Sequence, residues 1–176
     1  MFKARGEERP TAPVAGGAAA ILCAWLVAGC GFHLRGEAAL EYKSLQVSAV
    51  GPSQVAPEIR RTLATGPTRV VTSVKDAEAQ LRILQESRDK IVATITGTGT
   101  VYEYELRLTV RYDLVVPGRE LPVVAPTEIV AKRLITYSAS APTAKEAEEQ
   151  LLFKDMQVEV AGRILRQIAV ARRNEM

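Results

Sequence analysis

The side chains that could act as nucleophiles or metal ligands are few. The chain has two cysteines, Cys23 and Cys30, and one histidine, His33. A zinc site, a CxxC redox motif or a Cys–His catalytic pair needs more of these residues at a defined spacing. No serine has a histidine partner in the rest of the chain, and the carboxylates form no recognisable pair for acid–base catalysis. We therefore predict that the protein is not an enzyme and that it holds no metal or cofactor.

Cys30 can carry out a different chemistry, because its surroundings are those of a lipid-modified cysteine. Basic residues near the start are followed by an apolar run from about Val14 to Val27. This run is shorter than the roughly 20 residues that span a bilayer, and it fits a secretory signal peptide. It ends in Val27-Ala28-Gly29-Cys30, and small residues before a cysteine are typical of a lipobox. We predict that residues 1–29 are cleaved and that the Cys30 thiol is acylated.

Acylation would fix the location of the protein. Each buried CH₂ contributes about 0.8 kcal/mol, so several acyl chains form a nearly permanent anchor. By resemblance to bacterial lipoproteins, a glycine such as Gly31 directly after the cysteine is not an inner-membrane retention signal. This favours the outer membrane. The alternative is an ordinary secretory signal peptide followed by a chance cysteine. In either case His33, close to the processing site, is expected to have a linker role.

Cleavage would leave 147 residues, enough for one domain with a substantial core. Residues 1–29 hold three basic and two acidic side chains, so 20 of the 23 basic and 18 of the 20 acidic residues remain. This balance lacks the basic excess of a nucleic-acid-binding protein. We predict a lipidated tether over residues 30–43 and an α+β domain over residues 44–176.

The first half of this domain contains strand, helix and strand patterns. Residues 44–50 alternate apolar and polar side chains, as a strand does. A helix is expected from near Ser53, with Val55, Ile59 and Leu63 on one face, and Gly66-Pro67 ends it. Residues 68–74 then form a second strand. A strand–helix–strand unit of this length predicts parallel strands joined by a crossover.

The second half contains the strongest pattern in the chain. Residues 79–96 are predicted to form one long or bulged strand, followed by a turn over residues 96–100. Residues 102–116 alternate strictly between apolar and polar side chains, which predicts a long strand with one buried and one solvated face. Arg107 and Arg111 lie on the solvated face, where they are expected to pair with Glu105 and Asp113.

The chain ends with one more strand and a long helix. The strand is expected over residues 127–138, with Arg133 in its otherwise apolar register. Thr143-Ala144-Lys145-Glu146 is a capping box, which predicts a helix from there to about Arg172. Its apolar stripe is expected to include the following residues: Ala147, Leu151, Met156, Val160, Ile164, Leu165 and Ile168. The simplest architecture is a four-stranded mixed sheet with both helices on one face, in the order β-α-β-β-β-α.

These residues resemble a known family. Cys30-Gly31-Phe32-His33-Leu34-Arg35-Gly36 after a lipobox is similar to the mature N-terminus of the lipopolysaccharide-assembly lipoproteins, LptE. The Tyr102-Glu103-Tyr104 strand, the Val115-Val116-Pro117-Gly118 break and the Thr143–Glu146 helix start follow that family's order. The resemblance covers roughly Cys30 to Ile168.

The resemblance implies a non-enzymatic partner of LptD, the large outer-membrane β-barrel that translocates lipopolysaccharide. It implies that the domain faces the periplasm, plugs the barrel lumen, helps the barrel to assemble and binds lipopolysaccharide. In the family, basic residues near the middle hairpin and near the start of the last helix make the lipid contacts. Here the hairpin over residues 96–100 has no basic residue, and only Lys145 matches.

Lys145 is therefore the first candidate for a lipid A phosphate, and the alternative is an ordinary exposed lysine in the first helical turn. Lys132 and Arg133 are further candidates, because Arg133 interrupts an apolar register; it could instead extend along the sheet edge into solvent. The competing function is a lipid-binding or scaffold lipoprotein of another envelope transport complex. The identity of the protein that co-purifies distinguishes the two.

Overall fold

The computed structural model describes residues 40–137 and 141–173. The predicted signal peptide, Cys30 and His33 lie outside these residues. The elements in chain order are β1 (Ser44–Ala49), α2 (Val55–Ala64), β2 (Arg69–Val71), the 3₁₀ turn η1 (Val74–Asp76), β3 (Ala79–Ile95), β4 (Val101–Val115), β5 (Val124–Thr136) and α3 (Pro142–Arg173). Leu40 and Tyr42, which precede β1, are buried in the core.

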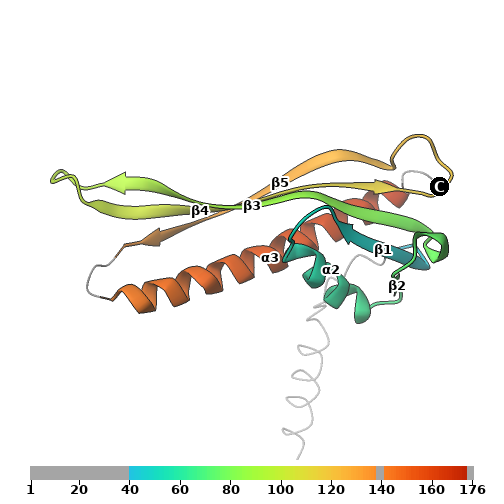
Figure 1. The fold of residues 1–176 in the computed structure, drawn as a ribbon, viewed down its shortest axis with the longest axis horizontal. Helices are drawn as coiled ribbons and strands as arrows, with labels where there is room; N and C mark the ends of the chain where they lie inside the picture. Colours follow the sequence, from blue (N-terminus) through green and yellow to red (C-terminus); the bar gives the residue numbers. More distant parts are fainter. Residues whose placement is uncertain (1–39, 138–140, 174–176) are drawn as a thin grey trace, which may run out of the picture. The chain divides into compact units, whose positions relative to one another are not determined.

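The strands form one mixed sheet in the order β2-β1-β3-β4-β5, and both helices cover the same face of it (Figure 1). β1 pairs in parallel with β2 and β3, whereas β3, β4 and β5 form an antiparallel meander. The predicted α+β class, mixed sheet and one-sided helices are confirmed. The predicted number of four strands is wrong, because residues 68–74 and 79–96, each predicted as a strand, form two separate strands, β2 and β3, on either side of β1, and the sheet therefore has five. The turn η1 between them makes them separate strands.

The core lies between the sheet and the two helices. The alternation predicted for residues 102–116 is confirmed over Leu106–Leu114, where every second side chain of β4 is buried. From α3 the core receives Met156, Val160, Ile164 and Ile168, and from α2 it receives Ile59. Full burial of such side chains stabilises the fold by roughly 1.5–3 kcal/mol each. The face of the sheet turned away from α2 and α3 is called the open face below.

A carboxylate from the sheet fixes the start of α2. The helix was expected near Ser53 but begins at Val55, and its buried residues include Val55, Ile59 and Leu63 as predicted. The Glu86 carboxylate of β3 accepts hydrogen bonds from Ser53 Oγ at 2.6 Å, Gln54 N at 3.1 Å and Val55 N at 3.1 Å. An anion at a helix N-terminus binds otherwise unsatisfied N–H groups and the positive end of the helix dipole.

A β-bulge in β3 explains how Glu86 reaches the helices. Ala79, Leu81 and Ile83 face the core, but the pairing with β4 shifts between Ile83 and Gln85. A bulge adds one residue to one strand and so reverses the alternation that follows. Beyond the bulge the even-numbered residues Glu86, Arg88 and Lys90 share the register of the buried β4 residues Val110, Leu108 and Leu106. The bulge therefore turns three charged side chains toward the helical side.

The start of α3 differs from the prediction in two respects. The capping box is wrong, because the helix begins at Pro142 and Lys145 N already donates to Ala141 O at 3.2 Å. Proline fits the first helical position because it has no N–H to satisfy there. The apolar stripe also begins later than predicted: Ala147 and Leu151 are exposed, and the buried residues start at Phe153. The first turns of α3 therefore extend beyond the core.

The β3–β4 hairpin turn matches its glycine-rich sequence. Gly99 N donates to Thr96 O at 2.9 Å, and Gly99 has a φ of 83°, a conformation that side chains with a Cβ disfavour. In the part of the chain that the structure describes, no helix is both long and apolar enough to cross a membrane.

Candidate functional site

The interface between the sheet and α3 changes from apolar to ionic toward the N-terminus of the helix. On the N-terminal side of Phe153, contacts between the sheet and α3 involve charged and aromatic side chains. We call Arg88, Lys90, Tyr104, Arg133 and Lys145 the cationic seam, because they follow this boundary on β3, β4, β5 and α3. Arg88 lies over the Phe153 ring, 5.5 Å from its centroid, where the apolar core ends.

Lys90 connects β3 to the first turns of α3. Its Nζ donates to Glu149 Oε2 at 2.6 Å and lies 4.7 Å from the centroid of the Tyr104 ring. Tyr104 in turn packs edge-to-face against Tyr137, with ring centroids 6.1 Å apart. Lys90 thus has a carboxylate and a π-face as partners, which hold the exposed helix start beside the sheet.

Arg133 faces α3, as its place in the apolar register predicts. Its Nη2 donates to Glu159 Oε2 at 2.5 Å, and Arg163 Nη2 donates to Glu159 Oε1 at 2.5 Å. Glu159 therefore lies between two guanidinium groups. All three side chains are partly exposed, so the pairs position Arg133 more than they stabilise the fold.

Lys132 lies on the opposite side of β5, on the open face. Its Nζ is 3.4 Å from Glu105 Oε2, and Arg107 Nη2 is 2.6 Å from Glu105 Oε1. The hydrogen bond from Arg107, and then that from Lys132, hold the pKa of Glu105 below its ordinary value. Two cations share one carboxylate here, which leaves a net positive charge.

Lys145 lies in the first turn of α3, at the end of β5. Its Nζ donates to Thr136 Oγ1 at 3.1 Å and to Glu148 Oε2 at 2.8 Å. The structure therefore places Arg133 and Lys145 on the helical side and Lys132 on the other, so the three predicted residues do not form one cluster. Cys30 lies outside the described residues.

Arg88 and Lys90 were not predicted from the sequence as candidate site residues. Strict alternation from Ala79 would place both on the solvated face, and only the bulge brings them to the seam. No glycine or proline marks the bulge position, so the sequence gives no clear signal for it.

Charged residues also occupy the open face. Arg82 binds Asp113 through both oxygens, at 2.8 and 2.5 Å, and this hydrogen bonding raises the pKa of the guanidinium. Asp113 was expected to pair with Arg111, but Arg82 lies directly opposite it across the β3–β4 ladder. Arg111 is exposed. The open face is therefore largely polar, with charge pairs around Asp113 and Glu105, and it also exposes Ile91 and Leu134 on either side of Glu105.

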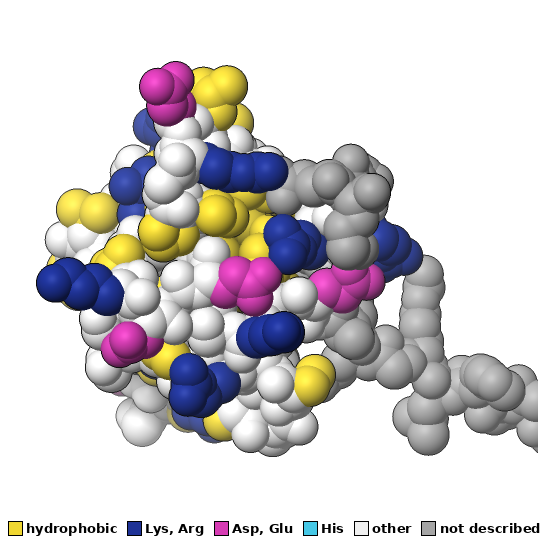
Figure 2. All heavy atoms as spheres, turned by 90° about the vertical axis from the view of Figure 1, so that its right-hand side faces the viewer, with side chains coloured by type: hydrophobic (Ala, Val, Ile, Leu, Met, Phe, Trp, Pro, Cys, Tyr) yellow, Lys and Arg dark blue, Asp and Glu magenta, His cyan; other side chains and the backbone are white. Residues whose placement is uncertain are grey.

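The end of the domain that carries the β4–β5 connection is different in character. Figure 2 shows this end, where basic side chains are scattered among acidic and uncharged ones and form no single basic patch. Among residues 40–137 and 141–173, no group of three His, Cys, Asp or Glu side chains is placed to hold a metal ion. The seam is thus a better candidate for anion recognition than this end.

Comparison with known families relates this arrangement to one of them. The sequence model of the family LptE, described as lipopolysaccharide-assembly, matches residues 42–168. The chain is 24% identical to the LPS-assembly lipoprotein LptE of Pectobacterium atrosepticum over 151 residues, covering 84% of this chain and 80% of the relative. It is 28% identical to the protein of the same name from Photorhabdus laumondii over 153 residues, covering 84% and 81%.

Solved structures share the fold. The uncharacterized lipoprotein B of Nitrosomonas europaea superposes with a TM-score of 0.69 at 28% identity, covering 79% of this chain and 90% of that one. The rare lipoprotein B of Shewanella oneidensis gives a TM-score of 0.65 at 27% identity, with 74% and 97% covered. The match thus extends across nearly all of the described elements.

Proposed function

Because the chain belongs to the LptE family of lipopolysaccharide-assembly proteins, we propose that it plugs and supports the assembly of an LptD-like β-barrel in the outer membrane. In this role it assists the insertion of lipopolysaccharide into the outer leaflet. Acyl chains on Cys30 anchor the protein to the membrane, and the domain faces the periplasm and the barrel lumen.

The observation that carries this proposal beyond the family is the open face of the sheet. It presents the Arg82–Asp113 pair and the Glu105, Arg107 and Lys132 group, together with exposed Arg111. The lumen of a large outer-membrane barrel is lined by polar side chains. A mostly charged sheet face can lie against such a polar wall, and Arg111 is available for an acidic residue of the wall.

Direct lipid contact is the finer part of the proposal. We place the phosphates of lipid A at Lys145, with Arg133 as a second cation on the same side and Lys132 as a separate contact. A phosphate carries more charge than the carboxylate of Glu148, so it can displace that group from Lys145 Nζ. Lys90, which lies between Glu149 and the two tyrosines, supplies a further positive charge at the seam.

A pull-down from native membranes tests the partner. The tagged, acylated protein is purified in detergent, and co-purifying proteins are identified by mass spectrometry. We expect a large β-barrel with an LPS-translocon sequence at equal stoichiometry. An inner-membrane transporter, or no partner, would show that the scaffold function of another envelope complex applies instead.

A filter-binding assay with labelled lipopolysaccharide tests the lipid site. We expect Lys145→Glu to weaken binding roughly tenfold or more, since a charged hydrogen bond contributes about 1.5–3 kcal/mol. Lys154→Glu is the matched control, because Lys154 is an exposed lysine on the same helix with the same charge change. Equal binding by the two variants would remove Lys145 from the site. Lys132→Glu and Arg133→Gln, assayed in parallel, separate the two sides of β5.

A further inference from the structure

β5 is the last strand of the sheet and has a long free edge. It pairs only with β4, and its backbone shows which groups face away from that partner. Val130 O accepts a hydrogen bond from Arg163 Nη1 at 3.4 Å, and Lys132 O accepts one from Arg133 Nη1 at 2.8 Å. Both carbonyls are therefore turned outward, away from β4.

The N–H groups of the same residues also point outward. In a strand the N–H and C=O of one residue lie on the same side, and those of the next residue lie on the other. Glu128, Val130, Lys132 and Leu134 thus present their N–H groups at the free edge, while the residues between them bond to β4. Edge strands with unpaired N–H groups are templates for another extended chain, which here would replace Arg163 and Arg133 at the Val130 and Lys132 carbonyls.

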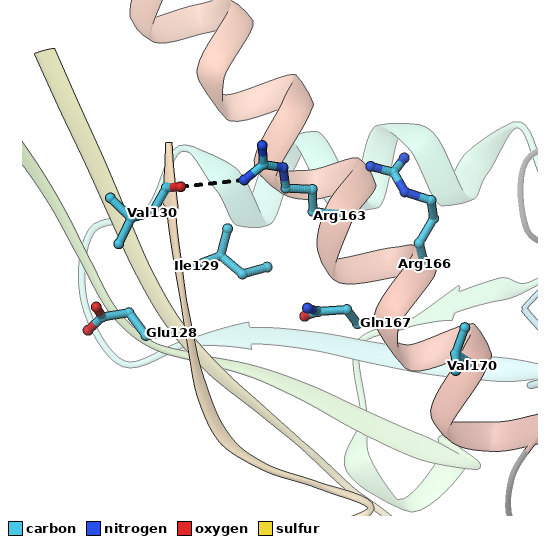
Figure 3. Close-up of a pocket in the computed structure, with 7 residues that line it drawn as sticks. All are labelled: Glu128, Ile129, Val130, Arg163, Arg166, Gln167 and Val170. Atoms are coloured by element: carbon cyan, nitrogen blue, oxygen red, sulfur yellow. Dashed lines mark hydrogen bonds between the residues drawn. The ribbon is translucent and has the colours of Figure 1, made fainter. Parts of the chain in front are cut away.

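A groove runs between this edge and α3. It has a volume of about 590 Å³, and it is lined by Glu128, Ile129 and Val130 from β5 and by Arg163, Arg166, Gln167 and Val170 from α3; the Glu128 carboxylate points away from α3 (Figure 3). Ile129 and Val170 make part of it apolar, and Val170 is 52% exposed. A strand added to the β5 edge would project every second side chain into this groove.

The α3 wall of the groove carries positive charge, and the acidic residue of the lining, Glu128, lies on β5. Arg163 is paired with Glu159 at 2.5 Å, but within residues 40–137 and 141–173 Arg166 has no ion-pair partner and is exposed. Figure 3 shows the Arg163 side chain reaching from α3 to the Val130 carbonyl of β5, with the Arg166 guanidinium farther from the strand. Arginine forms bidentate hydrogen bonds with carboxylates. The side chains that fit this groove are therefore acidic.

We propose that the β5 edge binds an extended acidic segment of a partner protein as a sixth strand of the sheet. The backbone of the segment accepts hydrogen bonds from the outward N–H groups of Val130 and Lys132. Its groove-facing positions, two residues apart, carry carboxylates that meet Arg166 and Arg163. The edge and the groove define the chemistry of the segment and not the protein that carries it, so this binding does not depend on the function proposed above.

A second copy of this chain fits less well. Antiparallel pairing of two β5 edges about Val130 would place Glu128 opposite Lys132, which is favourable. The same two-fold axis would bring Arg163 and Arg166 close to their own equivalents from the second copy. Four guanidinium groups would then face only two Glu159 carboxylates. This charge balance favours an acidic partner over self-association.

Site-specific photo-crosslinking in the organism's own cells tests the proposal with the full-length, acylated protein. A benzophenone amino acid replaces Val170 in the groove, or Val158, an exposed valine on the same helix, as the control position. We expect the Val170 adduct to contain a peptide of another protein with at least two acidic residues at alternate positions, and no such adduct at Val158. A lipid, a second copy of this chain, a neutral or basic peptide, or no adduct at Val170 would overturn the proposal.

Two substitutions then separate charge recognition from strand pairing. Arg166→Glu should reduce the yield of the Val170 adduct at least tenfold, while Arg166→Lys should retain most of it. Val130→Pro removes one outward N–H without removing a bond to β4 and should reduce the yield similarly. Circular dichroism checks that each variant is folded. If Val130→Pro unfolds, Arg166→Glu still tests the proposal, because it changes only an exposed side chain. An unchanged yield with folded Arg166→Glu would refute recognition by charge.

Discussion

Replacement of Glu86 by alanine should detach the start of α2 from the sheet. The Glu86 carboxylate accepts hydrogen bonds from Ser53 Oγ and from the backbone N–H groups of Gln54 and Val55, and its side chain is only 5% exposed. A hydrogen bond to a charged group contributes about 1.5–3 kcal/mol, and a buried donor that loses its partner adds a similar cost. Water reaches this helix end in the variant and replaces some of these bonds. We expect the free energy of unfolding to fall by about 2–4 kcal/mol.

Urea denaturation followed by far-ultraviolet circular dichroism measures this loss. Glu86→Gln keeps an acceptor oxygen and the side-chain volume, so it should lose about 1–2 kcal/mol, because it gives up the charge at the helix N-terminus. Glu120→Ala, at an exposed loop glutamate, is the matched control and should change stability by less than about 0.5 kcal/mol. If Glu86→Ala resembles Glu120→Ala, the reasoning that this carboxylate fastens α2 to β3 is refuted.

Three other changes have defined outcomes. Leu108→Ala in the fully buried stripe of β4 should lower the free energy of unfolding by about 2–5 kcal/mol, measured by the same denaturation; a loss below 1 kcal/mol would contradict the core assignment. Burial raises the pKa of Tyr112 to about 12, above the ordinary value of about 10, so its contribution to stability is complete below pH 10 and is lost as pH rises toward 12. Absorbance at 295 nm should show a late-titrating phenol that Tyr112→Phe removes. Cys30→Ser should shift the protein from the membrane fraction to the soluble fraction after cell lysis; retention in the membrane would argue against lipidation at this position.

Much of the fold was predictable because burial on one face gives each element its own periodicity. The alternation in β4 and the four-residue spacing of Val55, Ile59 and Leu63 report directly which side chains meet the core. Each of the five strands was predicted as a segment, but the predicted sheet of four was wrong, because periodicity does not report which strands pair with β1. The start of α3 was misplaced because a capping box describes a local preference, whereas Pro142 sets the first turn. The family assignment confirms that the chain is not an enzyme and that it is a lipoprotein of lipopolysaccharide assembly.

The candidate site was less predictable, since it depends on which strand residues face α3. Arg133 was identified from its apolar register and does face the helix, where Glu159 holds it. Lys90 was missed because the bulge after Ile83 reverses the alternation of β3. Lys132 and Arg133 are neighbours in the sequence, but a strand places neighbours on opposite faces. Whether Lys145, Lys132 or Arg133 contacts lipid stays a prediction for the binding assay.

The position of β1 has a mechanical consequence for an anchored protein. A lipid on Cys30 would transmit any pull on the domain through the residues that precede β1. β1 is an inner strand, and parallel ladders to β2 and β3 hold it on both sides. Upstream of it, Lys43 N donates to Glu78 at 2.8 Å, and Lys43 O accepts from Arg69 N at 3.0 Å. Tension along β1 would load these bonds together in shear instead of opening them one after another, so the tether joins the sheet where it best resists force.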